Sequence, residues 1–259
     1  MENNVDCMLK TAIKAAKETG NIIIKSMHNK KILGYKKEDD LLTDTDLKAE
    51  KKILSIIKEK FPTHGFYTEE GLGKKTASDH LWVIDPLDGT TNFFHSLPYF
   101  SVSIAHLFKG RVDLGVVFDP LRKELFHAEK GKGAFLNNKK IRVSSTSRVT
   151  NALLISGFPF EKNSIKKNLK DIEKFFDAGT RGIRNMGSAA LNLCYVSCGR
   201  FDGLWEYGLK PWDHAAGSII ITEAGGKITK INGEKYEVFK NDILATNSKI
   251  HNEMLKVLR

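Results

Sequence analysis

The chain has 259 residues, of which 41% are hydrophobic and 28% are charged, and its formal net charge is +10. These proportions are ordinary for a soluble globular protein of one large domain or two joined halves. Its longest apolar runs are too short to span a bilayer, no signal-peptide pattern is visible, and its three cysteines suit a reducing compartment, so we expect a cytoplasmic protein without a membrane partner.

The positive charge favours anionic partners, either phosphorylated metabolites or nucleic acid. The lysines are scattered along the chain, and no zinc-finger spacing, RNA-binding aromatic motif or basic-region heptad is present. Nucleic acid therefore stays possible as a partner, but a small phosphorylated metabolite is favoured.

The first part of the chain predicts two helices followed by strands. Apolar residues at helical spacing predict a helix over 5–27, and a polar cluster at 40–46 opens a second helix that runs to about Lys60. Short strands are expected at 66–68 and 81–84. From Phe100 onward, tight turns separate four strands of an antiparallel meander, at 101–108, 112–118, 124–129 and 134–143.

After about Ser147 the chain alternates between strands and helices. Strands are predicted at 153–155 and 201–206, and a small strand and a terminal helix close the chain. Helices are predicted at 162–177, 188–198 and 212–224. This alternation predicts an α/β (α+β) layered fold. We divide it into an N-terminal half, 1–147, and a C-terminal half, 148–259, which form one catalytic unit.

The stretch 81–92 holds the most informative pattern. An apolar run ends at Asp85, and Pro86 removes a backbone donor, so the strand should end there. Asp88 follows, and then Gly89 and Thr90 suit a close backbone approach and a helix start. Carboxylates bind hard cations, and helical N–H groups bind phosphate. Together they suggest metal-assisted phosphoryl chemistry.

Two further acidic residues can join this turn: Glu69 at a strand end and Asp213 at a helix start. Two unit charges 4 Å apart repel by about 4 kcal/mol at an effective dielectric constant of 20. A cluster of four carboxylates must therefore bind cations or raise its pKa values. The helix dipole alone also favours an Asp in the first turn of a helix. The position of Asp213 by itself therefore does not indicate a metal ligand, and its role depends on the other three acids.

Three rival patterns are weaker. Cys194-x₅-Arg200 has the bare spacing of a cysteine phosphatase, but it lies in an apolar helical run without a glycine loop. Asp44-Thr45-Asp46 has the form of an aspartyl nucleophile motif but follows no clear buried strand. The loop from Asp85 would place Ser96 where an EF-hand requires Glu.

Three motifs together resemble the inositol monophosphatase family, which belongs to the lithium-sensitive, magnesium-dependent phosphatases that include fructose-1,6-bisphosphatase. They are Glu69-Glu70-Gly71, the run from Trp82 to Asn92 (WVIDPLDGTTN), and Trp212-Asp213-His214-Ala215-Ala216-Gly217. The resemblance covers roughly residues 40–226. It implies a layered αβαβα sandwich and a homodimer.

The resemblance also implies roles for individual residues. The ligands of two or three Mg²⁺ ions would be Glu69, Asp85, the carbonyl of Leu87, Asp88 and Asp213, with help from the Thr90 hydroxyl. The catalytic group would be Asp46 and Thr90, which orient the attacking water, together with Glu69. The substrate contacts would be Asp88, Gly89, Thr90, Gly187, Ser188, Ala189, Glu206 and Asp213. Because oxygen ligands dominate, none of His95, His106 and His214 is expected to be a ligand.

The implied reaction is hydrolysis of a small phosphorylated polyol or sugar, most simply inositol-1-phosphate, by a metal-activated water. Fructose-1,6-bisphosphate, histidinol phosphate, 3′-phosphoadenosine 5′-phosphate and NADP stay open as substrates, since they would share the metal site. A different class also stays open, a non-catalytic RNA- or transcription-complex-binding protein on the same fold, which the +10 charge motivates.

Overall fold

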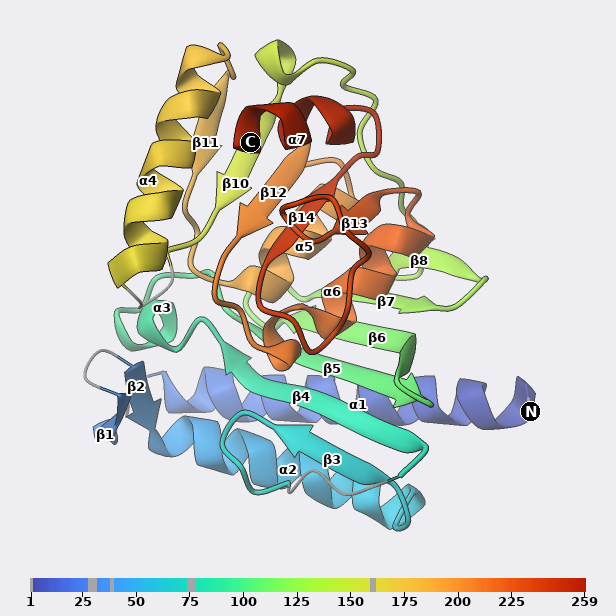
Figure 1. Ribbon diagram of the computed structural model, residues 1–259. Helices are drawn as coiled ribbons and strands as arrows, with labels where there is room; N and C mark the ends of the chain where they lie inside the picture. The colour runs from blue at the N-terminus through green and yellow to red at the C-terminus, as the bar shows by residue number, and fades with distance from the viewer. Residues whose placement is uncertain (1, 28–31, 38–39, 74–77, 159–161) are drawn as a thin grey trace.

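The computed structural model describes residues 2–27, 32–37, 40–73, 78–158 and 162–259. It stacks helices and sheets in five layers (Figure 1). The first layer is a helix pair, α1 (Glu2–Ser26) and α2 (Asp44–Lys60), which agrees with both predicted helices. Between them the chain forms a two-stranded hairpin, β1 (Ile32–Lys37) and β2 (Asp40–Thr43), which was not predicted. Thr43 caps α2, since its hydroxyl accepts a hydrogen bond from the Thr45 amide.

A seven-stranded sheet forms the second layer. Its order is β3-β4-β5-β6-β7-β8-β9; β3 pairs with β4 in parallel and all other neighbours are antiparallel. The strands are β3 (Gly65–Thr68), β4 (His80–Asp88), β5 (Ser101–Phe108), β6 (Arg111–Asp119), β7 (Glu124–Glu129), β8 (Gly133–Leu136) and β9 (Lys139–Lys140). The predicted meander is thus confirmed, with a turn at Asn137–Asn138 between the last two strands.

The predicted end of the central strand at Asp85 was wrong. β4 continues through Pro86 to Asp88, and its pairing register with β5 shifts between Asp85 and Asp88. An irregularity of this kind accommodates a proline, because the missing N–H falls where the ladder is already interrupted. The short helix α3 (Thr90–Phe94) follows directly. The bulged strand end therefore presents Asp85 and Asp88 side by side with the start of α3.

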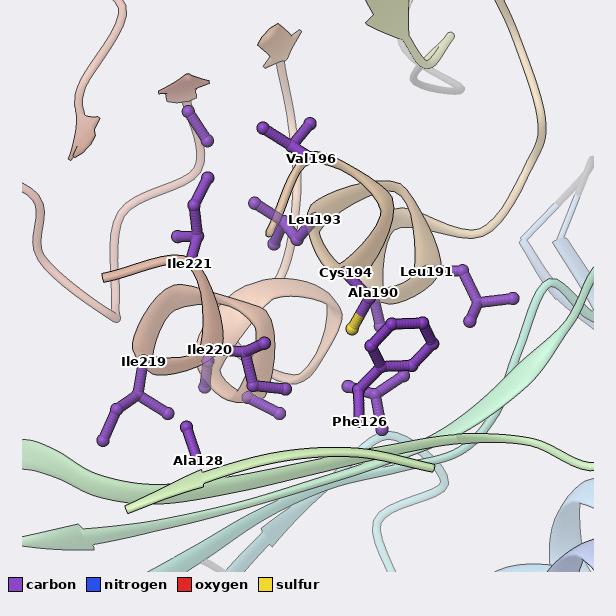
Figure 2. Close-up of a cluster of buried hydrophobic side chains, with 14 of the residues drawn as sticks. Phe126, Ala128, Ala190, Leu191, Leu193, Cys194, Val196, Ile219, Ile220 and Ile221 are labelled. Carbon is purple, nitrogen blue, oxygen red and sulfur yellow. The ribbon is translucent and has the colours of Figure 1, made fainter. Parts of the chain in front are cut away.

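Helices α5 (Ala189–Ser197) and α6 (Pro211–Glu223) form the middle layer, close to the predicted bounds. Both are buried nearly all round, which fits a helix pair that lies between two sheets. Figure 2 shows how apolar side chains of the two helices, among them Cys194 and Ile220, face Phe126 and Ala128 of the larger sheet, whereas Leu193 and Val196 point away from that sheet. This cluster also includes residues of the second sheet.

The second sheet has the order β11-β10-β12-β14-β13, in which β14 is antiparallel to both neighbours. Its strands are β10 (Leu153–Ser156), β11 (Gly182–Arg184), β12 (Gly203–Glu206), β13 (Lys227–Thr229) and β14 (Ile243–Thr246), and a 3₁₀ turn, Val149–Asn151, precedes β10. Helices α4 (Lys162–Asp177) and α7 (His251–Leu258) form the last layer. The three-residue strand β11 was not predicted, and two strands stand where one small strand was expected near the end.

Three apolar clusters fill the spaces between the layers, and the one around α5 and α6 reaches both sheets. Alternate residues of β4 show the consequence: Trp82 and Ile84 pack toward α1 and α2, whereas Val83 packs toward α5 and α6. A third cluster, which includes Phe175 and Trp205, lies between the second sheet and the α4–α7 layer. The predicted layered αβαβα sandwich is confirmed. None of the described helices is long and apolar enough to cross a membrane. The division at residue 147 stays a prediction.

Candidate active site

Carboxylates from four separate segments lie close enough to shift one another's pKa. Asp85 is buried, and burial raises its pKa well above the ordinary value; the charges of Glu69, Asp88 and Asp213 raise it further. The pKa of Asp213 is likewise raised by burial and by the charges of Glu69, Asp88 and Glu206. The structure therefore brings together the four acidic residues that the sequence predicted to converge, and it adds Glu206 to them.

Local hydrogen bonds hold each of these carboxylates in place. Asp85 Oδ1 accepts from the Leu87 amide at 3.0 Å, which shapes the bulge of β4. Asp213 Oδ2 accepts from the Lys210 amide at 2.7 Å and so closes the first turn of α6. The helix-start role that the sequence allowed for Asp213 is thus real, and it coexists with the placement of Asp213 among the other acids.

Asp88 lies at the N-terminus of α5. It accepts hydrogen bonds from the Ala190 amide at 2.9 Å, the Ala189 amide at 3.2 Å and the Ser188 hydroxyl, and Ser101 adds a longer contact at 3.4 Å. Burial raises the Asp88 pKa to about 6, although the bonds from Ser188 and Ala190 act in the opposite direction. Ser188 and Ala189 were predicted as substrate contacts, and here they position a carboxylate.

Thr90 connects the bulge with α2. Its hydroxyl lies 3.1 Å from Asp46 Oδ1 and 3.0 Å from the Leu87 carbonyl, and it can donate its single proton to one of these at a time. Asp46 is buried, and its other oxygen accepts from the Thr43 amide at 2.8 Å. The predicted pair of Asp46 and Thr90 is therefore in contact, and the Leu87 carbonyl faces the same hydroxyl.

Two glycines let the backbone of the turn approach its neighbours. Gly89 has φ +95°, and a Cβ there would lie 3.1 Å from the carbonyl oxygens of Gly187 and Tyr99. Gly187 has φ +83°, and a Cβ there would lie 2.8 Å from Asn92 Nδ2. The Asn92 amide in turn donates to the carbonyls of Met186 at 2.7 Å and of Tyr99 at 2.8 Å. Sequence reasoning quoted Asn92 within a motif but missed this bridging role.

Glu206, the last residue of β12, is the fifth acid of the group. It is buried, accepts a hydrogen bond from Asn192 Nδ2 at 2.8 Å, and burial raises its pKa to about 7. Asn192 also accepts from the Tyr99 hydroxyl at 3.0 Å. Neither Asn192 nor Tyr99 was singled out from the sequence, because nothing in their local pattern shows that they support an acid from another segment.

A further missed residue, Glu50 of α2, organises the loop that carries Glu69. Glu50 is fully buried and accepts hydrogen bonds from the Thr68 hydroxyl and from the amides of Glu70 and Leu72, at 2.7–2.8 Å. Its position four residues after Asp46, on the same helix, was the one sequence signal that could have pointed to it.

The donor chemistry of this group fits magnesium. All candidate ligands are oxygen atoms, which Mg²⁺ prefers. Burial is the largest cause of the raised pKa values, and the charges of neighbouring carboxylates add to it; a bound cation would relieve that repulsion.

A profile described as the inositol monophosphatase family matches residues 4–259. The chain belongs to the inositol monophosphatase family. It is 40% identical over 259 residues to a Nus factor SuhB of Pseudomonas aeruginosa, with 97% of this chain and 96% of that protein covered. It is 39% identical over 256 residues to the chloroplastic phosphatase IMPL1 of Arabidopsis thaliana, covering 96% of this chain and 69% of that protein.

The solved structure of an IMPase from Thermotoga maritima superposes with a TM-score of 0.90 at 37% identity, covering 97% of this chain and 96% of that one. The family resemblance stated from the three motifs is thus confirmed over the whole chain. At the level of the family, the chain is related to phosphatases.

Proposed function

We propose that the protein is a magnesium-dependent phosphomonoesterase that hydrolyses a small phosphorylated polyol, with inositol-1-phosphate as the first candidate. The observation that carries this proposal is the group of carboxylates at the bulge of β4, of which Asp85 and Asp88 are buried and whose charges raise the pKa values of Asp85 and Asp213. Four acids close together, two buried and two half-buried, repel one another, so a site of this kind is best explained by cations that it holds.

In this proposal Glu69, Asp85, Asp88, Asp213 and the Leu87 carbonyl hold Mg²⁺. Bound magnesium would lower the pKa of a coordinated water and neutralise charge on the phosphate. The Thr90 hydroxyl donates a hydrogen bond to Asp46, so the lone pairs of the Thr90 oxygen can accept from the attacking water and orient it. The amides of Gly89 and Thr90 would bind the phosphate, and Gly187 and Glu206 would face the hydroxyl groups of the substrate. No cysteine takes part, since Cys194 is buried and burial raises its pKa well above the ordinary value.

A phosphate-release panel tests the proposal. Inositol-1-phosphate, fructose-1,6-bisphosphate, histidinol phosphate, 3′-phosphoadenosine 5′-phosphate and NADP are each incubated with Mg²⁺, without it, and with added Li⁺. We expect release from at least one substrate that needs Mg²⁺ and is inhibited by Li⁺. Asp85→Asn and Asp213→Asn should lose activity but stay folded, whereas Asp79→Asn, an exposed acid just before β4, should keep it. If Asp85→Asn turned over substrate at the wild-type rate, the proposed set of Mg²⁺ ligands would be refuted.

A second candidate function rests on the names of relatives. Proteins of several bacteria that are 40–41% identical to this chain are named Nus factor SuhB, and the chain carries a net charge of +10. An RNA- or transcription-complex-binding role is therefore kept as the alternative. RNA affinity that survives Asp88→Asn, in a protein whose wild type releases no phosphate from the panel, would favour binding over catalysis. A homodimer remains a prediction, which light scattering can test.

A further inference from the structure

Three histidines from three segments meet at the end of β4 that lies farthest from the acidic group. His80 begins β4, His106 lies in β5, and His64 lies in the turn between α2 and β3. One ring nitrogen of each lies within 4.8 Å of those of the other two. In the parts of the chain that the structure describes, no other three His, Cys, Asp or Glu residues meet this distance.

His106 is already oriented as a metal ligand would be. It is buried, and its Nδ1 lies 2.6 Å from Asp113 Oδ1. A carboxylate only accepts, so the proton lies on Nδ1 and the lone pair lies on Nε2. Histidines that bind metals commonly donate their second N–H to a carboxylate in this way. In this tautomer Nε2 accepts from His80 Nδ1 at a distance of 3.1 Å.

His80 and His64 complete the group with small rearrangements. His80 Nδ1 now donates to His106, and moving its proton to Nε2 turns a second lone pair toward the same point. His64 stacks on His80, with ring centroids 4.4 Å apart, and its Nδ1 accepts from Trp82 Nε1 at 3.1 Å. To join the other two, His64 must rotate out of this stack and exchange the Trp82 N–H for the ion.

Metal binding requires neutral imidazole rings, and burial favours this form in two of the three. Burial, followed by the charges of His80 and His106, lowers the pKa of His64 to about 4. Burial also lowers the pKa of His80. Both residues are only half-buried, so an ion can reach them from solvent.

We propose that His64, His80 and His106 bind a Zn²⁺ ion, with Asp113 as the residue that orients His106. Imidazole nitrogen suits zinc, whereas magnesium prefers oxygen, so the two ends of β4 would select different metals. Asp88 lies eight residues beyond His80, roughly 26 Å along the strand, so the zinc does not touch the acidic group. Bound zinc ties the turn after α2 to β4 and β5. His106, which the sequence excluded as a ligand, thus becomes one.

Calorimetric titration of the full chain with Zn²⁺, in a large excess of Mg²⁺, tests this site. We expect one Zn²⁺ per chain. His80→Gln should abolish this binding, and Asp113→Asn should weaken it by about 10–100-fold, as the loss of an orienting carboxylate does. His95→Gln is the matched control, because His95 is exposed and far from the group in sequence; it should bind zinc like the wild type.

Two additional readouts separate this site from the acidic one. Zn²⁺ should shift the ring resonances of His64, His80 and His106 but not those of His95, and this holds even if His80→Gln fails to fold. Asp85→Asn should keep the zinc site whatever its effect on phosphate release. The proposal is overturned if no zinc binds in the presence of Mg²⁺. It is also overturned if zinc binding is lost in Asp85→Asn but unchanged in both His80→Gln and Asp113→Asn.

Discussion

Glu50→Gln should weaken magnesium activation although Glu50 is not a proposed ligand. The carboxylate of Glu50 accepts three hydrogen bonds from the loop that follows β3: Oε1 from the Thr68 hydroxyl and the Leu72 amide, and Oε2 from the Glu70 amide. Glu69 lies within this loop, and its amide donates to the Ile84 carbonyl at 3.2 Å. Glu50 is therefore the anchor of the segment that presents Glu69.

The size of the effect follows from these bonds. Glutamine has the same shape, but one of its two terminal atoms becomes an NH₂ group, which cannot accept. The best orientation keeps the oxygen at the position that serves two donors, so the Glu70 amide faces a donor instead of an acceptor. A hydrogen bond to a charged group contributes about 1.5–3 kcal/mol, and an unpaired buried N–H carries a similar penalty. If the loop shifts in response, about 2 kcal/mol corresponds to roughly 30-fold weaker Mg²⁺ binding.

The assay is phosphate release as a function of Mg²⁺ concentration, together with urea unfolding in EDTA. We expect Glu50→Gln to need roughly 30-fold more Mg²⁺ for half-maximal activity, with a free energy of unfolding lower by about 2 kcal/mol. Glu59→Gln, an exposed substitution on the same helix, should change neither. A variant that is destabilised but has the wild-type Mg²⁺ requirement would refute the reasoning, because Glu50 would then support the fold without positioning Glu69.

Three further predictions concern the turn itself. Thr90→Val should lower kcat by roughly 10²–10⁴-fold and change KM much less, since it removes the hydroxyl between Asp46 and the attacking water. Steady-state kinetics give kcat and KM for this variant and for the control Thr91→Val, whose side chain is exposed. Gly89→Ala should lower the free energy of unfolding by more than Gly71→Ala does. Both glycines have positive φ, but only at Gly89 would the added Cβ lie 3.1 Å from backbone oxygens. Urea unfolding compares the two variants, and equal losses would contradict the proposed crowding at Gly89. In EDTA, the free energy of unfolding should fall as pH rises from about 4 to about 6, because the folded state raises the pKa of Asp88 to about 6 and so loses stability when this carboxyl ionises. The expected loss is on the order of 3 kcal/mol. A urea-unfolding free energy that stays constant over this pH range would contradict the prediction.

The sequence predicted the elements that have strong periodicity. The helix over 162–177 was placed at its observed bounds, and the first three strands of the meander were placed within a residue, because amphipathic spacing and Asn or Gly turns mark them locally. The stretch 134–143 forms two shorter strands, β8 and β9. Sequence reasoning missed β11 and the β1–β2 hairpin, which are short and depend on neighbouring strands for their pairing. The end of the central strand was predicted at Asp85, three residues too early. Nothing in the local sequence around Pro86 shows that pairing with β5 resumes at Asp88 after the register shift.

The candidate site was predictable as a set of residues but not as an assembly. Motif resemblance named Glu69, Asp85, Asp88 and Asp213, and the structure brings them together. The residues that hold them, such as Glu50, were missed because their hydrogen bonds join segments about twenty residues apart. The histidine group was missed for the same reason: its members are spaced by 16 and 26 residues, which matches no ligand motif.

Asp85 and Asp88 lie at the end of β4 and Asp213 lies at the start of α6, and these rigid elements fix their positions. The residues before Asp85 on β4 are fixed on both faces, Ile84 toward α1 and α2 and Val83 toward α5 and α6. Ala215 and Ala216, two and three residues after Asp213, pack in the core between the sheets. Burial of these apolar neighbours favours the arrangement that brings the carboxylates together and opposes their mutual repulsion. A site placed on loops alone would relax until its charges separated, and the raised pKa of Asp85 would then disappear.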